Sequence, residues 1–408
     1  MDLEFVPSPV PDRPGLLIRD PYRYSDSTLI IPPALTRGLR LLDGAHTEID
    51  LHDFLARMAG RMDVAELAQH FLGALSEAGF LDDQTFQAMR QQRHDDFARA
   101  DRREAIHAGG GYPAGPPELE TTLQRWMAEP PRALPPGFPA RTTGQSRLLG
   151  IAAPHVSPFA APATYAAAYA ALPADAATRT FVILGTSHYG APGRFGLTRK
   201  AFRTPFGDAI TDGALVDRLA AAAPGAFVVE DYCHAIEHSV EFQVLFLQSR
   251  FGPGVKIVPV LCGPLLSARP DDDGHVAAAL DALGDLQARQ GNDLLWVLGV
   301  DMAHMGRRYG DSWRARAHAG EMVGVTTREA ARLDRIGAGD AEGFWQLVKG
   351  DGPAARRGED DLKWCGSAPL YAFLRAVPDA RGAVLAYDHW NIDDDSVVSF
   401  AALSFAGR

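Results

Sequence analysis

The sequence predicts an α/β protein with a mostly parallel central sheet flanked by helices, preceded by a small α+β domain. From about residue 146 to the end, apolar strand-like runs alternate with helical patterns, which is typical of parallel strands joined by crossover helices. Before about residue 88, short strand patterns precede helical ones and form a separate group. A length of 408 residues also favours two domains.

The small domain is assigned to residues 1–88. Short strands are expected at 16–20 and 28–32, followed by helical spacing from residue 35 and by helices that begin near Ile49 and Asp63. This order of two strands and three helices resembles a winged-helix or PqqD-like module. Residues 1–85 contain seven arginines, no lysine and twice as many acidic residues, so we expect protein or peptide recognition and no nucleic-acid binding.

Residues 89–145 are predicted to be a linker. The segment begins with a highly polar run at 91–96, and it contains three consecutive glycines at 109–111 and many prolines. Proline removes a backbone donor and fixes the backbone, so a compact sheet is not expected here. Only residues 118–127 show a helical pattern within this segment.

The larger domain, residues 146–408, contains three apolar runs that each end at a histidine. The runs are 148–155, 181–188 and 294–304. Open α/β sheets bind ligands just beyond the carboxyl ends of their strands, so these imidazoles are expected to converge. Imidazole is the commonest metal ligand in proteins and the usual acid or base near neutral pH. The pattern therefore predicts a metal or acid/base centre at this edge of the sheet.

Composition limits the function classes. The formal net charge of −11 disfavours binding to nucleic-acid phosphates, and no run of 18 apolar residues predicts a membrane span. The N-terminus lacks the basic and apolar regions of a signal peptide. Three cysteines do not form a disulfide framework and suit a reducing cytoplasm. We therefore expect a cytoplasmic protein with a small-molecule or peptide substrate.

Several residues have more than one interpretation. Asp301 can bind a metal, orient His304 or cap a helix. Cys365, close to the start of a helical pattern, can be a reactive thiolate or a small buried apolar residue. The string at 234–238 reads H-x-x-E-H, the spacing of inverted zincins, but the following helix is expected to begin only near residue 239. The two histidines would then not share a helical face.

Seven short strings, taken in order, resemble the Memo family, and in particular the bacterial proteins called AmmeMemoRadiSam system protein B. The resemblance covers about residues 146–405. Two departures from the family pattern are Thr186, where proline is common, and residues 156–158, where Gly and Tyr often follow the histidine. The strings are 153–155, 184–188, 204–208, 237–241, 301–304, 365–366 and 396–402.

The resemblance implies a fold similar to class III extradiol dioxygenases and a metal site of His155, His188 and Cys365. It implies Fe(II), with copper as the alternative, because a cysteine replaces the carboxylate of the usual two-histidine triad. His304 matches the acid/base histidine, with Asp301 beside it. The residues expected to line the same cleft are Glu237, His238 and Ser187.

Three functions follow from these expectations. The first is an iron-dependent oxidoreductase acting on an unidentified small molecule or peptide. The second is a non-catalytic metal-binding or adaptor protein that partners a radical SAM protein. The third and least favoured is a zinc hydrolase that uses the H-x-x-E-H string.

Overall fold

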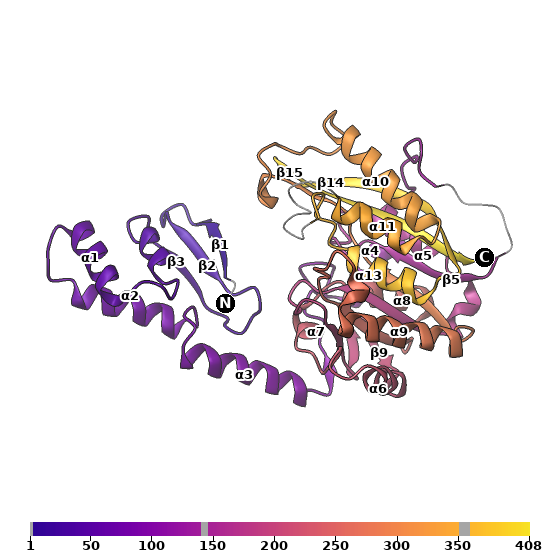
Figure 1. Ribbon diagram of the computed structural model, residues 1–408, viewed down its shortest axis with the longest axis horizontal. Helices are drawn as coiled ribbons and strands as arrows, with labels where there is room; N and C mark the ends of the chain where they lie inside the picture. Colours follow the sequence, from indigo (N-terminus) through magenta and orange to yellow (C-terminus); the bar gives the residue numbers. More distant parts are fainter. Residues whose placement is uncertain (1–2, 140–145, 351–359) are drawn as a thin grey trace. The chain divides into compact units, whose positions relative to one another are not determined.

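A computed structural model describes residues 3–139, 146–350 and 360–408 of the chain (Figure 1). The chain divides into two compact units, Met1–Arg99 and Ala100–Arg408. Within the described residues, no helix combines the length and the apolar character that crossing a bilayer requires.

The first unit is an antiparallel sheet of three strands, in the order β1-β2-β3, followed by helices. Its apolar core contains Ile18, Leu55 and Phe71. The first α-helix begins with a capping box, in which the side chains of Thr47 and Asp50 satisfy free backbone N–H groups. The elements are β1 (Glu4–Pro7), β2 (Leu16–Arg19), β3 (Thr28–Ile31), η1 (Thr36–Leu41), α1 (Glu48–Ala59), α2 (Ala65–Glu77) and α3 (Gln84–Arg99).

The unit boundary differs from the predicted one. The polar run at 91–96 lies inside α3, where long polar side chains favour a solvated helix, so the first unit extends to Arg99. The predicted linker is not a free connection either, because residues 100–139 belong to the second unit. Tyr112 and Trp126 are buried in its core despite the neighbouring prolines. The end of the predicted linker, residues 140–145, lies outside the described residues.

The second unit alternates strands and helices, as the sequence predicts. Its elements up to residue 262 are β4 (Arg102–Arg103), α4 (Pro116–Met127), β5 (Leu148–Ala153), α5 (Pro162–Ala170), η2 (Ala174–Thr178), β6 (Thr180–Thr186), β7 (Phe195–Leu197), β8 (Ala201–Thr204), β9 (Gly207–Thr211), α6 (Gly213–Ala222), β10 (Phe227–Val229), α7 (Cys233–Ile236), α8 (Glu241–Phe251) and β11 (Lys256–Cys262).

The remaining elements complete the same sheet and its covering helices. They are η3 (Pro270–Asp272), α9 (Gly274–Gln290), β12 (Leu294–Gly299), β13 (His304–Gly306), η4 (Arg307–Tyr309), α10 (Met322–Gly337), α11 (Ala341–Lys349), α13 (Ser367–Ala376), β14 (Ala380–Asp393) and β15 (Ser396–Gly407).

The sheet is mostly parallel at its centre. The main path runs β13-β15-β5-β12-β6-β11-β9-β8-β4, and β5, β12, β6 and β11 are all parallel to their neighbours in this group. The late strands are antiparallel, as expected, but β15 is not at the edge, because it pairs with β5, β13 and β14. The strand β12 therefore lies between β5 and β6, which places the strand ends that lead to His155, Asp301 and His188 side by side. The third apolar run does not remain one strand up to His304, because β12 ends at Gly299 and His304 begins β13.

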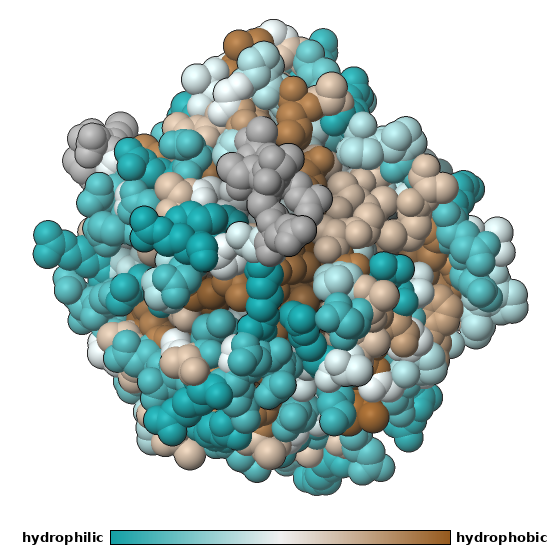
Figure 2. Space-filling view, turned by 90° about the vertical axis from the view of Figure 1, so that its right-hand side faces the viewer, coloured by the Kyte–Doolittle hydropathy of each residue, from teal (hydrophilic) through white to brown (hydrophobic). Residues whose placement is uncertain are grey.

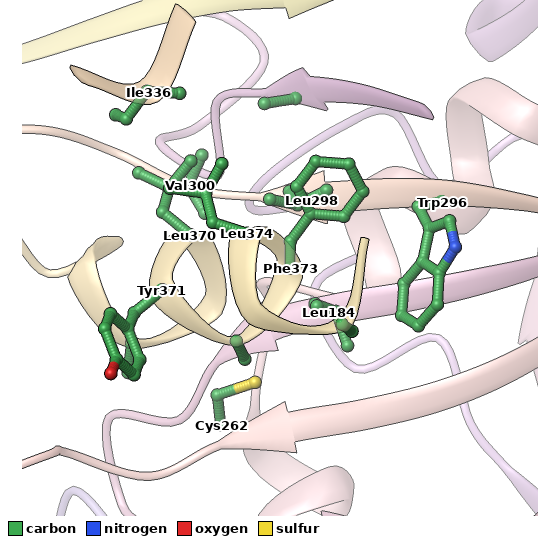
Figure 3. Packing of buried hydrophobic residues seen from close by; sticks show 14 of the residues in the cluster. Leu184, Cys262, Trp296, Leu298, Val300, Ile336, Leu370, Tyr371, Phe373 and Leu374 are labelled. Carbon is green, nitrogen blue, oxygen red and sulfur yellow. The ribbon is translucent and has the colours of Figure 1, made fainter. Parts of the chain in front are cut away.

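Helices cover both faces of this sheet. Residues of α6, α9, α10, α11 and α13 form one apolar cluster, and residues of α4, α5 and α8 form the other. Figure 3 shows α13 packed on the strands, with Phe373 near Leu298 and Trp296. The face of the second unit seen in Figure 2 is mostly hydrophilic, with hydrophobic side chains in patches between. The core is thus continuous on each side of the sheet, and the carboxyl ends of the strands remain available for a site.

Candidate metal centre

The predicted histidines meet at one edge of the sheet. His155 follows β5, His188 follows β6, and Asp301 follows β12, the strand between them. The ring centroids of His155 and His188 are 5.1 Å apart. Pro154 keeps the chain extended up to His155, and small residues allow the sharp turn at His188. The strand order explains why residues far apart in sequence converge.

His155 is buried and held in one orientation. Its Nδ1 lies 2.9 Å from the carbonyl oxygen of Gly299. Because a carbonyl only accepts, Nδ1 carries the proton and Nε2 has a free lone pair. That Nε2 lies 3.2 Å from Sγ of Cys365 and 3.5 Å from a carboxylate oxygen of Asp301. The imidazole is therefore preset as a metal ligand through Nε2.

One carboxylate holds two further imidazoles. Glu237 is 1% exposed and accepts from Nδ1 of His188 at 3.1 Å and from Nδ1 of His238 at 3.0 Å. It also accepts from the backbone N–H groups of His188 and His238. The two rings stack with centroids 5.0 Å apart. Protons on both Nδ1 atoms leave Nε2 of each ring free, the arrangement found where a carboxylate orients metal-binding histidines.

The electrostatics of the site favour the ionised form of the Glu237 carboxyl. Burial alone would raise the pKa of Glu237, but the imidazoles of His188 and His238 hold it well below the usual value. Burial lowers the pKa of His188, yet the Glu237 carboxylate outweighs that effect and raises it. Glu237 is therefore ionised near neutral pH and fixes the proton on its partner rings.

Asp301 organises the strand ends. Its Oδ1 accepts from the backbone N–H of His155 at 2.9 Å and of Val156 at 3.1 Å. Burial raises the pKa of Asp301, and the His304 imidazole and these N–H groups oppose that shift. Asp301 does not cap a helix, because the next element is the strand β13. Of the three interpretations left open by the sequence, orientation or metal binding remains.

Cys365 reaches the site from the loop before α13. Its Sγ lies 3.2 Å from Nε2 of His155, and burial raises the pKa of the free thiol well above its usual value. A Cβ on Gly366 would lie 2.5 Å from the carbonyl oxygen of Asp301, so only glycine allows this close approach. Thr186, one of the departures from the family pattern, donates from Oγ1 to the Cys365 carbonyl at 3.2 Å. This residue therefore positions the cysteine loop.

His304 lies beside the other residues as the first residue of β13. Its Nδ1 is 3.3 Å from the carbonyl oxygen of Lys363, which leaves Nε2 as an acceptor, and its ring packs edge-on against Tyr309. Burial, opposed by Asp301, lowers the pKa of His304 to about 4. The imidazole is thus neutral near neutral pH, with an unprotonated Nε2.

Two overlapping sets of ligand atoms can hold an ion. Among the described residues, one set is His155, His188 and His238, and the other is His155, Asp301 and Cys365, with the ligand atoms of each set within 4.8 Å of one another. His155 belongs to both sets. The implied ligands His188 and Cys365 belong to different sets. His238, predicted only to line the cleft, offers its ring nitrogen beside two predicted ligands.

The donor chemistry fits a transition metal. Imidazole nitrogens suit iron, copper and zinc, and a thiolate favours the softer of these ions. The Gly299 carbonyl fixes the tautomer of His155, and the Glu237 carboxylate fixes that of His188, so that free lone pairs face the same space. These residues therefore fit the group that the sequence resemblance implies.

The other residues that the sequence singles out do not all belong to the site. Ser187 is buried beside the site, and its Oγ has no hydrogen-bond partner among the described residues. His234 faces elsewhere, with Nε2 bound to the Gly196 carbonyl at 3.1 Å on the four-residue helix α7. The helix α8 begins at Glu241, so the two histidines of the H-x-x-E-H string do not share a helical face. The inverted-zincin geometry is absent from this described segment.

A brace that the sequence analysis missed comes from the segment predicted to be a linker. Arg103 is 1% exposed, pairs with the fully buried carboxylate of Glu241 and donates to the Glu237 carbonyl at 2.6 Å. The hydroxyl of Tyr112 donates to the same carboxylate, and His107 donates to it from its backbone N–H at 3.2 Å. An arginine amid prolines and glycines gave no local signal of burial. The brace fixes the turn that carries Glu237 and His238.

Replacing Glu237 by Gln is expected to weaken metal binding by about 10- to 100-fold. The carboxylate accepts through both oxygens, whereas an amide has one acceptor oxygen and an NH₂ group that can only donate. Competition with a chromophoric chelator measures the affinity. Glu342→Gln on the surface of α11 is the matched control and should leave the affinity unchanged. Equal affinities for both variants would contradict the orienting role of Glu237.

Clustered imidazoles, a thiol and carboxylates at the strand ends of this α/β sheet form a candidate metal site. The sequence matches the family model described as Memo-like protein over residues 103–404, so the chain belongs to the Memo family. The match begins at Arg103 and therefore includes the brace.

Curated relatives carry the same family name. A MEMO1 family protein of Aquifex aeolicus is 28% identical over 95% of this chain and 95% of its own length. A MEMO1 family protein of Methanopyrus kandleri, MK0963, is 35% identical over 73% of this chain and 96% of its own. A MEMO1 family protein of Thermus thermophilus, TTHA0924, is 28% identical over 77% and 85%. None of these names states a reaction.

Proposed function

We propose that this Memo-family protein is an iron-dependent oxidoreductase that acts on a small molecule or peptide, with copper as the alternative metal. The observation that carries the proposal is His155, whose Nδ1 is tied to the Gly299 carbonyl and whose Nε2 faces both a thiol and further imidazoles. A site built only for stability would not preset so many free lone pairs toward one space. The resemblance to class III extradiol dioxygenases supports the same chemistry.

The ligand sets divide the roles of the residues. In one set His155 and His188 would hold the ion together with His238. In the other set His155 and Cys365 would hold it together with Asp301. Bound iron supplies redox chemistry and Lewis acidity. His304 takes a proton at Nε2, because its Nδ1 faces the Lys363 carbonyl and burial keeps the ring neutral.

Metal analysis tests the first part of the proposal. Protein purified without oxygen is expected to contain about one iron per chain. Cys365→Ser is expected to lower that content, since hydroxyl is a poor ligand for soft ions. Cys233→Ser removes a thiol that belongs to neither ligand set and should keep the metal. Zinc alone, bound at full occupancy, would refute the iron proposal.

Oxygen uptake tests the catalytic part. His304→Ala is expected to retain the metal, because His304 belongs to neither set of ligand atoms, and to reduce oxygen uptake by about 10²- to 10⁴-fold. The measurement uses an oxygen electrode, metal-loaded protein and small-molecule extract. An equal rate for His304→Ala and the unmodified protein would contradict the proton-transfer role.

The second function, a metal-binding adaptor that partners a radical SAM protein, is favoured by the separate N-terminal unit. Its sheet and helices form a core of their own, in keeping with the proposed winged-helix or PqqD-like module. Its acidic surplus suits a protein or peptide partner. Absence of oxygen uptake across varied extracts, together with co-elution with a radical SAM protein from the same organism, would favour this function.

A further inference from the structure

A cavity in the larger unit shares no residue with the candidate metal centre. Its volume is about 410 Å³, within the range of small-molecule sites. Most of its wall is apolar, including Pro135, Met322 and Val323. A few polar groups converge on it, which is the usual composition of a pocket for an organic ligand.

The ionisable side chains that line the cavity are mostly of basic type. Arg132, His318 and His389 line it together with one acid, Asp388. Asp388 is already engaged by His318, whose Nε2 lies 3.2 Å from its Oδ1. Arg132 forms no ion pair with a carboxylate among the described residues, and its nearest polar contact is Nε2 of His318 at 3.4 Å. The guanidinium fork is therefore free to receive an anion.

His389 supplies an unmet hydrogen-bond group. The residue is 9% exposed, and its buried Nδ1 has no partner among the described residues. Its Nε2 lies 2.7 Å from the hydroxyl of Tyr387, which in turn contacts the buried carboxyl of Glu329. A buried polar atom without a partner is costly, so a ligand that bonds to it gains affinity.

We propose that this cavity binds a small organic carboxylate with an apolar body. The carboxylate would lie against Arg132 and Nδ1 of His389, and the body against Met322 and Val323. Arg binds carboxylates through two parallel N–H groups, and the apolar wall of the cavity suits the apolar body of the ligand. The binding site is separate from the proposed oxidoreductase chemistry.

The hydrogen-bond order behind the cavity depends on the Tyr387 hydroxyl, which donates to the carboxyl of Glu329 and lies 2.7 Å from Nε2 of His389. With this order Nε2 of His389 bears the proton and Nδ1 is an acceptor. Because a hydroxyl can rotate, the proposed ligand requires the opposite order, in which Tyr387 donates to Nε2 and a protonated Glu329 donates to Tyr387. Nδ1 then bears the N–H and donates to the ligand carboxylate. Burial raises the pKa of Glu329, which is the direction that this order needs.

The same chain reaches toward the metal centre. Oγ of Ser399 lies 2.5 Å from the carboxyl of Glu329 and accepts from the backbone N–H of Ala303 at 2.9 Å. Ala303 lies in the loop between Asp301 and His304. A ligand in the cavity is thus connected by hydrogen bonds to the loop that carries the proposed catalytic residues.

Binding of 3-phenylpropionate tests the proposal, with neutral 3-phenylpropionamide as the matched probe. Calorimetry or ligand-observed NMR on the full chain measures both. The carboxylate is expected to bind about tenfold or more tightly than the amide, and Arg132→Gln and His389→Phe should each remove that preference. Arg289→Gln, an exposed residue of α9 outside the cavity, should leave it unchanged.

The outcomes separate clearly. Equal binding of acid and amide, or an acid preference that survives Arg132→Gln, overturns the anion site. Failure of both probes to bind at 10 mM, about the weakest affinity that a site of this kind should show, overturns the cavity as a ligand site. Loss of the acid preference in Arg132→Gln, which replaces an exposed side chain and should fold normally, supports the proposal even if His389→Phe is unstable.

Discussion

Replacing Arg103 by Ala is expected to destabilise the larger unit by about 3–5 kcal/mol. The guanidinium is the only cation that pairs with the buried Glu241 carboxylate among the described residues, apart from His107 at 3.9 Å. It also binds the carbonyls of His234 and Glu237. Removing one partner leaves a buried charge without compensation, which is far more costly than losing a surface pair.

Tryptophan fluorescence during urea unfolding measures this effect. All six tryptophans lie beyond residue 99, so the signal reports on the larger unit alone. Arg102→Ala is the matched control. Arg102 is the neighbour of Arg103 in sequence, but its side chain is 38% exposed and pairs at 3.5 Å with Asp208. That change should cost about 1 kcal/mol or less. A similar loss for both variants would contradict the brace.

A second variant identifies the cause. Adding Glu241→Gln to Arg103→Ala removes the unpaired charge and keeps an acceptor for Tyr112. Part of the lost stability should then return, since the neutral amide avoids the cost of a buried ion. No recovery would mean that the carbonyl bonds of Arg103, rather than its charge, hold the turn.

The strand ends of the site could be predicted from sequence, and their order could not. Apolar runs that stop at His155 and His188 identify strands, because a buried parallel strand has a continuous apolar pattern. Which strand lies between them depends on helix packing across the whole sheet. The placement of β12 between β5 and β6 therefore came only from the structure. The late strands were found, but the inner position of β15 was not.

Sequence patterns did not reveal the residues that position the candidate ligands from distant parts of the chain. His238 was assigned to the cleft wall, because nothing local shows that Glu237 aims its ring beside His188. From sequence, Thr186 is only a departure from the family pattern, yet its hydroxyl donates to the carbonyl of Cys365. Arg103 lies in a segment rich in prolines and glycines, where burial depends on the turn that it contacts. Local sequence pattern indicates candidate ligands better than it indicates the residues that hold them in place.

Replacing His155 by Asn is expected to reduce bound metal from about one ion per chain to background. His155 belongs to both ligand sets, so neither set keeps three ligands without it. The loss should exceed the 10- to 100-fold effect expected for residues that only orient ligands. Metal analysis after anaerobic purification, followed by titration of the metal-free protein with Fe(II), measures it.

His234→Asn is a close control for this change. His234 is also 1% exposed, and it too bonds to a backbone carbonyl, that of Gly196 at 3.1 Å. Both variants therefore lose a buried imidazole of similar environment, but only His155 has a second nitrogen among ligand atoms. His234→Asn should retain the metal even if both variants melt at lower temperature. Full metal content in His155→Asn would show that the ion binds elsewhere, since every three-ligand arrangement in the described residues passes through that ring.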